Sequence, residues 1–394
     1  MYKIFHNRFN LPEKQLFYVG KRDRNEKRNF LFISKLLGKH IAVSPDVVKA
    51  SGYLLSSLKY GFENKSYISC IEGLGVPSYC ERADDSNILV IGFCETTTAL
   101  GMSVASSIKG SDYITTTREQ IIGIKNLLKF EEQHSHASTH CMYSDSLHFN
   151  NYKEIIFVDD EITTGQSLLN IIAEIVKICS IRKFSILTIL DWRNDEMRRY
   201  FKDYSSKIKA EITVYSLLDG NIKHTSNTIY CNSELTYVNT ETTANSLNIF
   251  RRMMVPTINN ATTSYVVQTG RFGVNSNDID EVEELSRIAA HRIAGTIGNV
   301  TNIIVLGHGE NIYIPSRIAA YLFKMGYKVA FKTTSRTPIY CDGEIIKDAV
   351  VFYDRGIKYH FYNRVEAEEY DKVIMITETQ FTKKICNNLI VFNL

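Results

Sequence analysis

Residues 155–167 read IIFVDDEITTGQS, and this stretch decides the fold that we expect for the chain. Its first four residues are apolar and predict a buried strand, and acidic residues follow where that strand would end. A Thr-Thr-Gly turn then leads into LLNIIAEIV at 168–176, whose apolar spacing predicts a helix. A strand, a short polar turn and a helix in this order are typical of a parallel α/β sheet.

The polar residues of this stretch suit a sugar phosphate, because ligands of such sheets bind where strands end and the next helices begin. Asp159 and Asp160 are placed to accept hydrogen bonds from two neighbouring ribose hydroxyls. Amides and hydroxyls at the helix start are placed to hold a phosphate, and Gly165 lets the backbone approach it. The candidate residues of this phosphate loop are Glu161, Thr163, Thr164, Gly165, Gln166 and Ser167. The simpler alternative is a capped helix with solvated carboxylates.

A second strand, loop and helix of this kind lies upstream. Residues 87–93 read NILVIGF and predict a buried strand, and a helix is expected from about residue 99. The polar loop between them consists of Cys94, Glu95, Thr96, Thr97 and Thr98. Hydroxyls and amides ahead of a helix favour phosphate binding, whereas a plain turn capped by threonine is the alternative.

Residues 113–118, YITTTR, are expected to form the next strand, and the guanidinium of Arg118 suits phosphate charge. The long polar segment 119–152 follows, and long loops of this kind often act as lids. Its candidate lid residues, expected to face the substrate, are His134, His136 and His140. A zinc site with Cys141 is an alternative, although H-x-H-x3-H-C matches no metal signature, and a structural or surface role is another.

The whole chain has 394 residues, which suggests two domains. With 44% hydrophobic and 23% charged residues it has the composition of a soluble globular protein, and its net charge of +3 gives no sign of nucleic-acid binding. Eight cysteines without a C-x-x-C pair indicate reduced thiols and a cytoplasmic location. No secretory core and no apolar run of about 20 residues are present, so we expect no membrane contact.

The tail of the chain, 270–394, reads as an altered second copy. TNIIVLGHGEN at 301–311 repeats the strand, glycine and glutamate of the upstream motif, and VAFKTTSRTP at 329–338 repeats the strand that ends in Arg118. Coincidence among repeated βα units is the alternative. The candidate residues of a phosphate or nucleotide site in this second domain are His308, Gly309, Glu310, Ser335 and Arg336.

The second copy lacks the acidic motif. Arg118 lies 41 residues before Asp159, and the same interval from Arg336 ends at Thr377. The sequence there has neither paired aspartates nor Thr-Gly. We therefore expect a similar α/β scaffold that cannot hold ribose in the same way.

The stretch 155–167 resembles the phosphoribosyl-diphosphate (PRPP) binding motif of type I phosphoribosyltransferases, with Gln166 where a small residue or Thr is commoner. Together with FCETTTALG at 93–101, HSHA at 134–137 and TSRTP at 334–338, it makes the chain similar to phosphoribosyltransferase-like proteins with a C-terminal TRSP domain, encoded with bacterial tellurite-resistance or stress genes.

The resemblance implies an α/β fold: a phosphoribosyltransferase-type parallel sheet flanked by helices, with a second, degenerate α/β domain. The expected domains are a phosphoribosyltransferase-like domain with an N-terminal hood at 1–218, a linker or cover segment at 219–268 and a TRSP-like domain at 269–394.

The resemblance also implies an activity, the transfer of ribose 5-phosphate from PRPP to an unidentified nitrogenous base with release of pyrophosphate, in the synthesis of a nucleoside-like metabolite. Asp159, Asp160 and Arg118 would be the catalytic residues, and the loop 94–98 would bind pyrophosphate. The implied cofactor is Mg²⁺, held through PRPP with the two aspartates and not by the protein alone. A non-catalytic PRPP-binding regulator of a stress operon is the alternative. The expected partners are PRPP and a base, with a homodimer or an operon-encoded protein as further candidates.

Overall fold

The computed structural model describes residues 2–25, 28–77, 81–131, 139–223, 228–232, 235–258, 262–363 and 369–394. By its internal contacts the chain divides into two compact units, each made from three separate stretches. Unit 1 comprises 1–11, 49–224 and 251–281, and unit 2 comprises 12–48, 225–250 and 282–394. These units cut across the expected boundaries at 1–218, 219–268 and 269–394, which stay a prediction.

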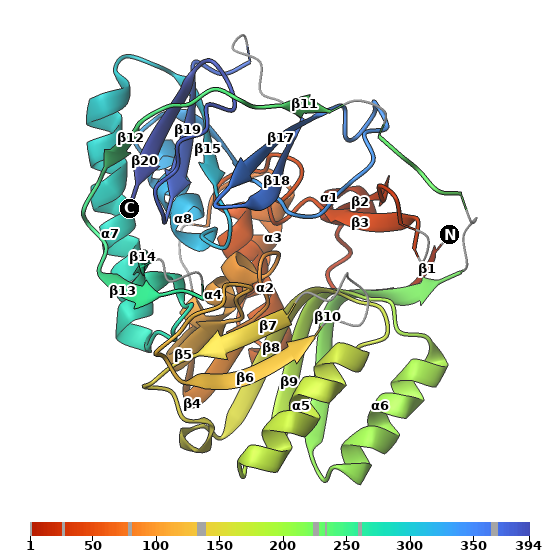
Figure 1. The fold of residues 1–394 in the computed structure, drawn as a ribbon. Helices are drawn as coiled ribbons and strands as arrows, with labels where there is room; N and C mark the ends of the chain where they lie inside the picture. The colour runs from red at the N-terminus through yellow and green to blue at the C-terminus, as the bar shows by residue number, and fades with distance from the viewer. Residues whose placement is uncertain are drawn as a thin grey trace. The chain divides into compact units, whose positions relative to one another are not determined.

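A six-stranded sheet forms the centre of unit 1, in the order β1-β10-β9-β8-β4-β5 (Figure 1). Strands β10 to β5 run parallel to their neighbours, and β1 is antiparallel to β10. The strands are β1 (Tyr2–Asn7), β4 (Ala83–Gly92), β5 (Ile108–Thr115), β8 (Glu154–Ile162), β9 (Lys183–Asp191) and β10 (Glu211–Ile222). The expected parallel sheet is thus confirmed.

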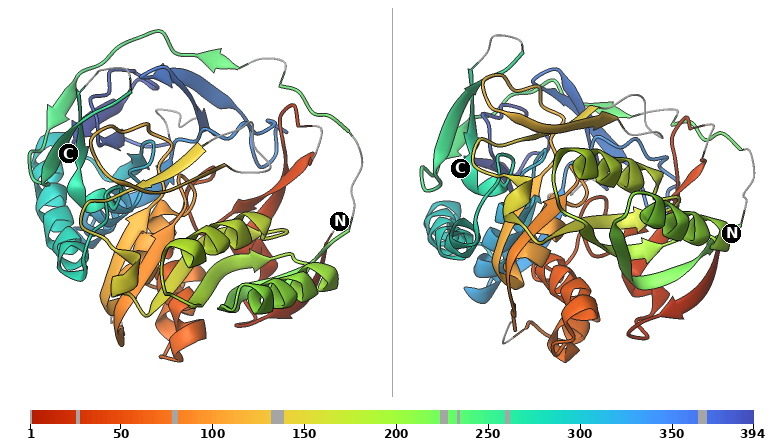
Figure 2. Two further views of the ribbon diagram at one scale, coloured as in Figure 1. Left: turned by 60° about the horizontal axis from the view of Figure 1, so that its bottom comes forward. Right: turned by 90° about the horizontal axis from the view of Figure 1, so that it is seen from below.

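Two helices, α5 (Gln166–Ile178) and α6 (Asp195–Lys207), lie side by side along one face of this sheet (Figure 2). Their apolar residues form one core with alternate strand residues such as Leu89, Phe157 and Ile186. The intervening strand residues face the opposite side, because strand side chains alternate, and α4 (Thr98–Ser106) packs on β4, β5 and β8 there. The other elements of unit 1 are α3 (Lys65–Ile71), β6 (Asn126–Glu131), β7 (Thr139–Tyr143), η1 (Phe149–Asn151), β13 (Arg252–Pro256), β14 (Thr262–Val266) and η2 (Val267–Thr269).

Strand β8 is longer than expected. The prediction that it ends before Asp159 is wrong, because the ladder with β9 continues, with Asp159 paired to Thr188 and Ile162 paired to Asp191. The strand expected at 113–118 instead ends at Thr115. The long polar segment 119–152 contains the antiparallel hairpin β6–β7.

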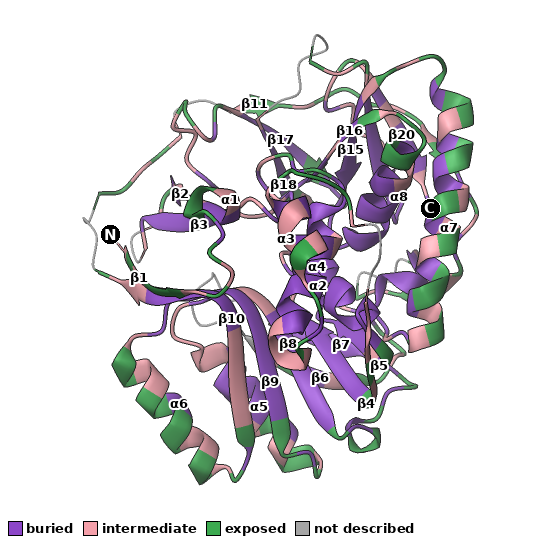
Figure 3. Ribbon diagram, turned by 180° about the vertical axis from the view of Figure 1, so that it is seen from behind, coloured by how far each residue is buried: buried purple, intermediate pink, exposed green. Residues whose placement is uncertain are grey.

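Unit 2 is built on a five-stranded sheet in the order β12-β20-β19-β15-β16, in which every neighbouring pair is parallel. Apart from the short β12, its strands are buried along most of their length (Figure 3). The strands are β12 (Ala244–Ser246), β15 (Asn302–Gly307), β16 (Lys328–Thr333), β19 (Lys372–Thr377) and β20 (Leu389–Asn393). The other elements of unit 2 are α1 (Glu13–Leu16), β2 (Phe17–Lys21), β3 (Phe30–Ser34), β11 (Thr236–Tyr237), α8 (Tyr313–Lys324), β17 (Ala349–Asp354) and β18 (Ile357–Tyr362). The second α/β domain is therefore present.

Both sheets contain the same run of four parallel strands, β5-β4-β8-β9 in unit 1 and β16-β15-β19-β20 in unit 2. In chain order these strands are β4, β5, β8 and β9 in unit 1 and β15, β16, β19 and β20 in unit 2. A helix follows the first strand of each unit: α4 follows β4, and α8 follows β15. An antiparallel hairpin precedes the third strand of each unit: β6–β7 precedes β8, and β17–β18 precedes β19. The strand orders agree with the prediction of an altered second copy. The units differ between the third and fourth strands, because α5 joins β8 to β9, whereas residues 378–388, all described, contain no helix between β19 and β20.

Each unit also contains a hairpin from a distant part of the sequence. In the chain, this hairpin comes just before the four strands of the other unit. The first arm, residues 12–48, carries β2–β3 and lies in unit 2, where Val43 bridges Phe331 of β16. The second arm, residues 251–281, carries β13–β14 and lies in unit 1, where Val274 bridges Tyr113 of β5. The chain passes between the units within α2 (Val47–Tyr60) and α7 (Ser276–Ile297). Part of the expected linker is therefore an ordered hairpin.

Candidate functional site

The sheet of unit 1 has a topological switch point between β4 and β8. From β4 the chain continues to β5 on one side, and it later returns to β8 on the other side. Open α/β sheets bind their ligands beyond the carboxyl ends of the strands at such a point. Gly92, the last residue of β4, is paired with Val158 of β8. The two loops predicted to bind phosphates therefore begin on neighbouring strands.

The acidic pair lies at the end of β8, with both carboxylates half-exposed. Oδ1 of Asp159 accepts a hydrogen bond of 2.9 Å from the backbone N–H of Asp160. Within the described ranges the carboxylate of Asp160 takes part in no ion pair. Because these neighbours both lie in a strand, their side chains point to opposite faces of the sheet. A ligand at the end of β8 would therefore meet the two carboxylates on different sides of the sheet.

The phosphate loop turns at Gly165, the residue before α5, whose φ of 71° lies in the left-handed region. A Cβ at this position would lie 2.3 Å from Cζ of Phe201 on α6, so the loop needs glycine for conformation and for space. The amide of Gln166 lies 3.4 Å from Oγ1 of Thr164, and its side chain donates to Asn170 on α5. This leaves Gln166 facing along the helix and keeps the loop's own backbone as the part that would meet a phosphate.

A buried ion pair that the sequence reading missed supports this loop. Asp191, at the end of β9, accepts two hydrogen bonds of 2.9 Å from Arg193 and one of 3.0 Å from Arg198. The guanidinium of Arg193 lies 4.2 Å from the ring centroid of Phe201, the ring that packs on Gly165. The only sequence signal was an acid directly after an apolar strand, and the partners of such an acid cannot be read from the sequence.

The loop after β4 is held together by its own hydroxyls. Oγ1 of Thr97 accepts from the backbone N–H of Phe93 at 2.7 Å and donates to the carbonyl of Phe93 at 3.0 Å. Oγ1 of Thr98 donates to the carbonyl of Glu95 at 3.0 Å. The peptide bond between Cys94 and Glu95 is cis. The Thr97 and Thr98 hydroxyls thus shape the loop, and its backbone and Thr96 are left as the groups nearer solvent.

Arg118 lies beside this loop. Its Nη1 is 4.0 Å from Oε1 of the buried Glu95, and its Nε donates to Nε2 of His140 at 3.4 Å. The ring is fully buried, and its Nδ1 lies 3.1 Å from Oγ1 of Thr116. His140 therefore lies in the wall that orients Arg118, which differs from its expected place on a lid, because β7 pairs with β6 and with Thr117.

A second buried arginine joins this wall from the second arm. Nη1 of Arg271 donates to Oγ1 of Thr117 at 2.7 Å, and its guanidinium lies 4.5 Å from the ring centroid of Tyr265. The two bonded residues are 154 positions apart in the chain. No local pattern in the sequence indicated this contact. The other two candidate lid residues, His134 and His136, lie outside the described residues.

In unit 2 the structure divides the candidate residues into two groups. His308 is buried, with Nδ1 2.9 Å from Oγ1 of Thr334 and Nε2 3.2 Å from Oδ2 of Asp354. Burial alone would raise the pKa of Asp354, but hydrogen bonds and charge from His308 and Arg355 outweigh it and lower that pKa. Ser335 is fully buried, and its Oγ accepts from the N–H of Thr337. His308 and Ser335 therefore lie buried inside unit 2, and their role stays a prediction.

The remaining candidates of unit 2 lie around the loop after β15. Gly309 has a φ of 63°, Glu310 is buried, and Arg336 is half-buried. Nε and Nη2 of Arg336 donate to the hydroxyl of Tyr359 at 3.2 and 2.8 Å.

No group of three or more His, Cys, Asp and Glu side chains within the described ranges is placed to hold a metal ion. The zinc alternative stays a prediction, because two of its ligands, His134 and His136, lie outside the described residues. Mg²⁺ has different needs, because it binds through one or two carboxylates together with substrate oxygens and water. The half-exposed Asp159 and Asp160 fit that requirement as oxygen donors.

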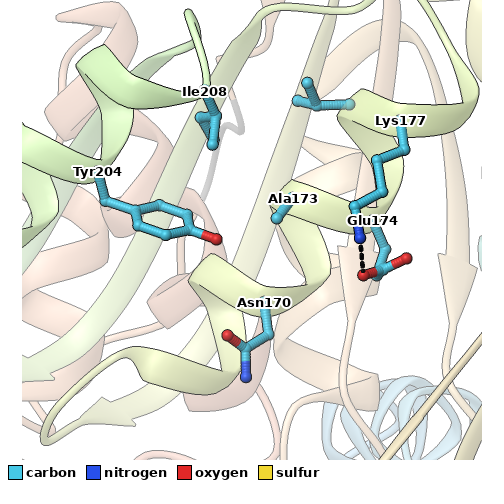
Figure 4. Close-up of a pocket in the computed structure, with 7 residues that line it drawn as sticks. Asn170, Ala173, Glu174, Lys177, Tyr204 and Ile208 are labelled. Carbon is cyan, nitrogen blue, oxygen red and sulfur yellow. Dashed lines mark hydrogen bonds and ion pairs between the residues drawn. The ribbon is translucent and has the colours of Figure 1, made fainter.

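A groove of about 450 Å³ lies between α5 and α6 (Figure 4), lined by Asn170, Ala173, Glu174, Val176, Lys177, Tyr204 and Ile208. Lys177 donates to Glu174 at 2.6 Å along its rim. Asn170 lies in the first half of α5 and accepts from Gln166 of the phosphate loop, and the other lining residues lie further towards the carboxyl ends of the two helices. The groove therefore begins about one helical turn from the phosphate loop.

The fold defines a doubly wound α/β protein with two polar loops at its switch point. A family model described as phosphoribosyl transferase matches residues 16–221, and a model of the TRSP domain, which stands C-terminal to that transferase domain, matches residues 268–392. The first match covers more than half of the chain, and the chain belongs to this phosphoribosyl transferase family. No curated protein matches it.

Solved structures of phosphoribosyltransferases are distantly similar. The adenine phosphoribosyltransferase of Trypanosoma brucei is 12% identical, over 53% of this chain and 79% of its own, with a TM-score of 0.33. The enzyme of Leishmania donovani is also 12% identical, over 57% and 93%, with a TM-score of 0.33. That of Giardia lamblia is 13% identical, over 54% and 96%, with a TM-score of 0.32. At these values we draw nothing about substrate from the likeness.

None of the helices in the described ranges combines the length and apolar character needed to cross a membrane.

Proposed function

We propose that the protein transfers ribose 5-phosphate from PRPP to a nitrogenous base and releases pyrophosphate. One observation supports this above the others. Gly92 and Val158 are paired neighbours, so the loop with Glu95, beside which Arg118 lies, and the loop with Asp160 and Gly165 start together at the switch point. A diphosphate and a pentose phosphate joined in one molecule need two such loops side by side.

In this proposal, different residues of the site bind different parts of PRPP. The backbone around Gly165 and the start of α5 hold the 5-phosphate, because helix N-termini favour anions. Asp159 and Asp160 accept hydrogen bonds from the ribose hydroxyls. Arg118 faces the diphosphate, where a guanidinium forms strong charge-assisted hydrogen bonds. Holding both ends of the substrate fixes the anomeric carbon, and such positioning accounts for several kcal/mol of barrier.

In the reaction the bond between the anomeric carbon and the diphosphate oxygen breaks, and its electron pair leaves with pyrophosphate. The lone pair of a ring nitrogen forms the new bond to that carbon, and the nitrogen's proton is released to solvent. The sugar ring passes through an oxocarbenium-like state, as in glycoside hydrolysis. Bound Mg²⁺ would neutralise charge on the diphosphate oxygens. Arg118, kept in place by His140, stabilises the leaving group as its charge develops.

The test is pyrophosphate release when PRPP and Mg²⁺ are mixed with a panel of purines, pyrimidines and other nitrogen heterocycles. We expect turnover with at least one base, and we expect Arg118→Gln to reduce kcat/KM by about 100-fold, since oxyanion-type donors contribute on this scale. His140→Phe should reduce kcat more weakly, by about tenfold, because it only frees Arg118 to move.

Calorimetric titration with PRPP separates this proposal from its rival. Tight binding without turnover over the whole panel would favour a PRPP-binding regulator. Absence of both binding and turnover would remove the proposed site altogether.

A further inference from the structure

The loop after β15 in unit 2 repeats the hydrogen bonds of the loop after β4 in unit 1. In unit 1 the N–H of Thr116 donates to the carbonyl of Gly92 at 3.0 Å, and Oγ1 of Thr116 accepts from the N–H of Cys94 at 3.0 Å. In unit 2 the N–H of Thr334 donates to the carbonyl of Gly307 at 3.1 Å, and its Oγ1 lies 3.4 Å from the N–H of Gly309. The first residues of the two loops are therefore fixed in the same way.

The arginines beside these loops are also equivalent. The residue between Thr116 and Arg118 exchanges two backbone hydrogen bonds with Cys141, and Ser335, between Thr334 and Arg336, exchanges two with His360. The side chain that meets each arginine comes from one residue earlier, His140 in unit 1 and Tyr359 in unit 2. Arg336 is thus held beside its loop as Arg118 is held beside the other.

The part of unit 1 that would hold a pentose has no counterpart. Val158 is paired with Gly92, and Ile376 is paired with Gly307, so Thr377 and Glu378 stand where Asp159 and Asp160 stand. This register confirms the predicted position of Thr377. No helix follows β19 in the fully described stretch 378–388, so the turn that starts α5 is missing too. What unit 2 retains is the loop and the arginine.

Buried polar groups in this loop and at the end of β16 have no hydrogen-bond partner among the described residues. Asn311, directly ahead of α8, is 1% exposed, and neither Nδ2 nor Oδ1 has a hydrogen-bond partner among the described residues. Oγ1 of Thr333, the last residue of β16, is also buried and also has no hydrogen-bond partner among the described residues. An unsatisfied buried amide destabilises the folded state unless a ligand uses it.

We propose that unit 2 carries a second binding site, formed by Gly309, Asn311, Arg336 and the start of α8, for the phosphate or diphosphate group of a small molecule. The 12-residue helix α8 presents its positive end to the loop, as helices that bind anions do. Arg336 supplies charge, the Asn311 amide supplies a donor, and Gly309 lets the backbone approach closely. This site lies at the switch point between β15 and β19 and does not depend on turnover in unit 1.

The experiment is amide hydrogen exchange of the full chain, read by mass spectrometry, with inorganic pyrophosphate as the probe, with and without Mg²⁺. We expect slower exchange of peptides covering 307–316. Arg336→Gln should raise the pyrophosphate concentration for half protection at least tenfold there, whereas Arg118→Gln should leave it unchanged. No protection of 307–316 at millimolar pyrophosphate, or protection that survives Arg336→Gln unchanged, would overturn the proposal.

Asn311→Leu separates binding from folding. Since the amide has no partner among the described residues, a leucine of similar size should leave the Tm unchanged or raise it, while protection of 307–316 is lost. A lower Tm with protection intact would make Asn311 structural and would contradict its role. Protection in unit 2 without PRPP turnover would sustain this site and refute the proposed transfer reaction, so the two failures are distinguishable.

Discussion

Strands β8 of unit 1 and β19 of unit 2 occupy matching positions in sheets with the same strand order. The connections that follow them, to β9 and to β20, differ. The first contains Gly165 and the 13-residue helix α5. The second has no helix, and Phe381 and Ile385 from this connection join the apolar core over the sheet. The comparison teaches that a sheet can keep its strand order and its first loop while it loses the turn and helix at which we propose that a pentose phosphate binds.

Asp159 and Asp160, at the end of β8, provide the strongest test of this difference between the units. Asp160→Asn should lower kcat/KM for PRPP by about 1,000-fold, about 4 kcal/mol, because an amide accepts ribose hydrogen bonds and charge less well than a carboxylate. Glu378→Gln, at the matched position of unit 2, should change PRPP turnover less than twofold. Steady-state kinetics with the base identified by the panel would measure both.

Asp159→Asn sharpens the result, since the two acids point to opposite faces of the sheet. Equal losses in both single variants would support a shared sugar site. A loss at Glu378 as large as that at Asp160 would show that unit 2 takes part in the transfer and would break the comparison.

The glycine turn provides a second test. Gly165→Ala should lower the free energy of unfolding by about 3 kcal/mol, because alanine is strained at positive φ and its Cβ would collide with Phe201. Gly298→Ala in unit 2 is the matched control, with a φ of 75° and no atom within 4 Å of the added Cβ. It should cost about 1 kcal/mol from backbone strain alone. Urea unfolding of the full chain measures both values, and equal costs would refute the role of Phe201.

Acid provides the smallest test, at the position where His360 of unit 2 matches Cys141 of unit 1. Burial, aided by the charge of Lys358, lowers the pKa of His360 to about 4. The folded ring then stays neutral while the unfolded chain binds a proton below about pH 6.5, so stability is lost as the pH falls from 6.5 towards 4. Between pH 7 and pH 5 this amounts to about 2 kcal/mol.

His360→Phe keeps an aromatic ring against Tyr362, on which His360 stacks at 5.5 Å. We expect the variant to lose less stability between pH 7 and pH 5 than the wild type, measured by urea unfolding at each pH. An identical pH slope in both proteins would show that the acid sensitivity comes from other groups.

The sequence predicted those features whose cause is local. Runs such as IIFV at 155–158 and NIIVLG at 302–307 are apolar enough to require burial, and both are strands. The interval of 41 residues placed Thr377 correctly, because the same elements intervene in both copies. The turn at Gly165 was readable for the same reason, since its glycine serves the adjacent backbone.

The features that the sequence could not predict depend on distant partners. The bond from Arg271 to Thr117 joins residues 154 positions apart, and no pattern near either one indicates it. Strand β8 continues past Asp159 because Thr188 and Asp191 of β9 pair with it, which a local count of apolar residues cannot show. The placement of the two arms, 12–48 in unit 2 and 251–281 in unit 1, could not be predicted for the same reason. The sequence pattern of a hairpin does not indicate which unit the hairpin packs in.

The placement of the two arms has a consequence for how the chain is made. Val43 in the first arm finds its partner Phe331 only after 288 further residues have been added, and Tyr113 must wait for Val274. Contacts this distant in sequence slow folding and prolong the exposure of unpaired strand edges. A cut at residue 218 or 268 would leave each half without the arm residue, Val274 or Val43, that bridges its edge strand. We therefore expect the two halves to be recovered in soluble form only when they are synthesised together.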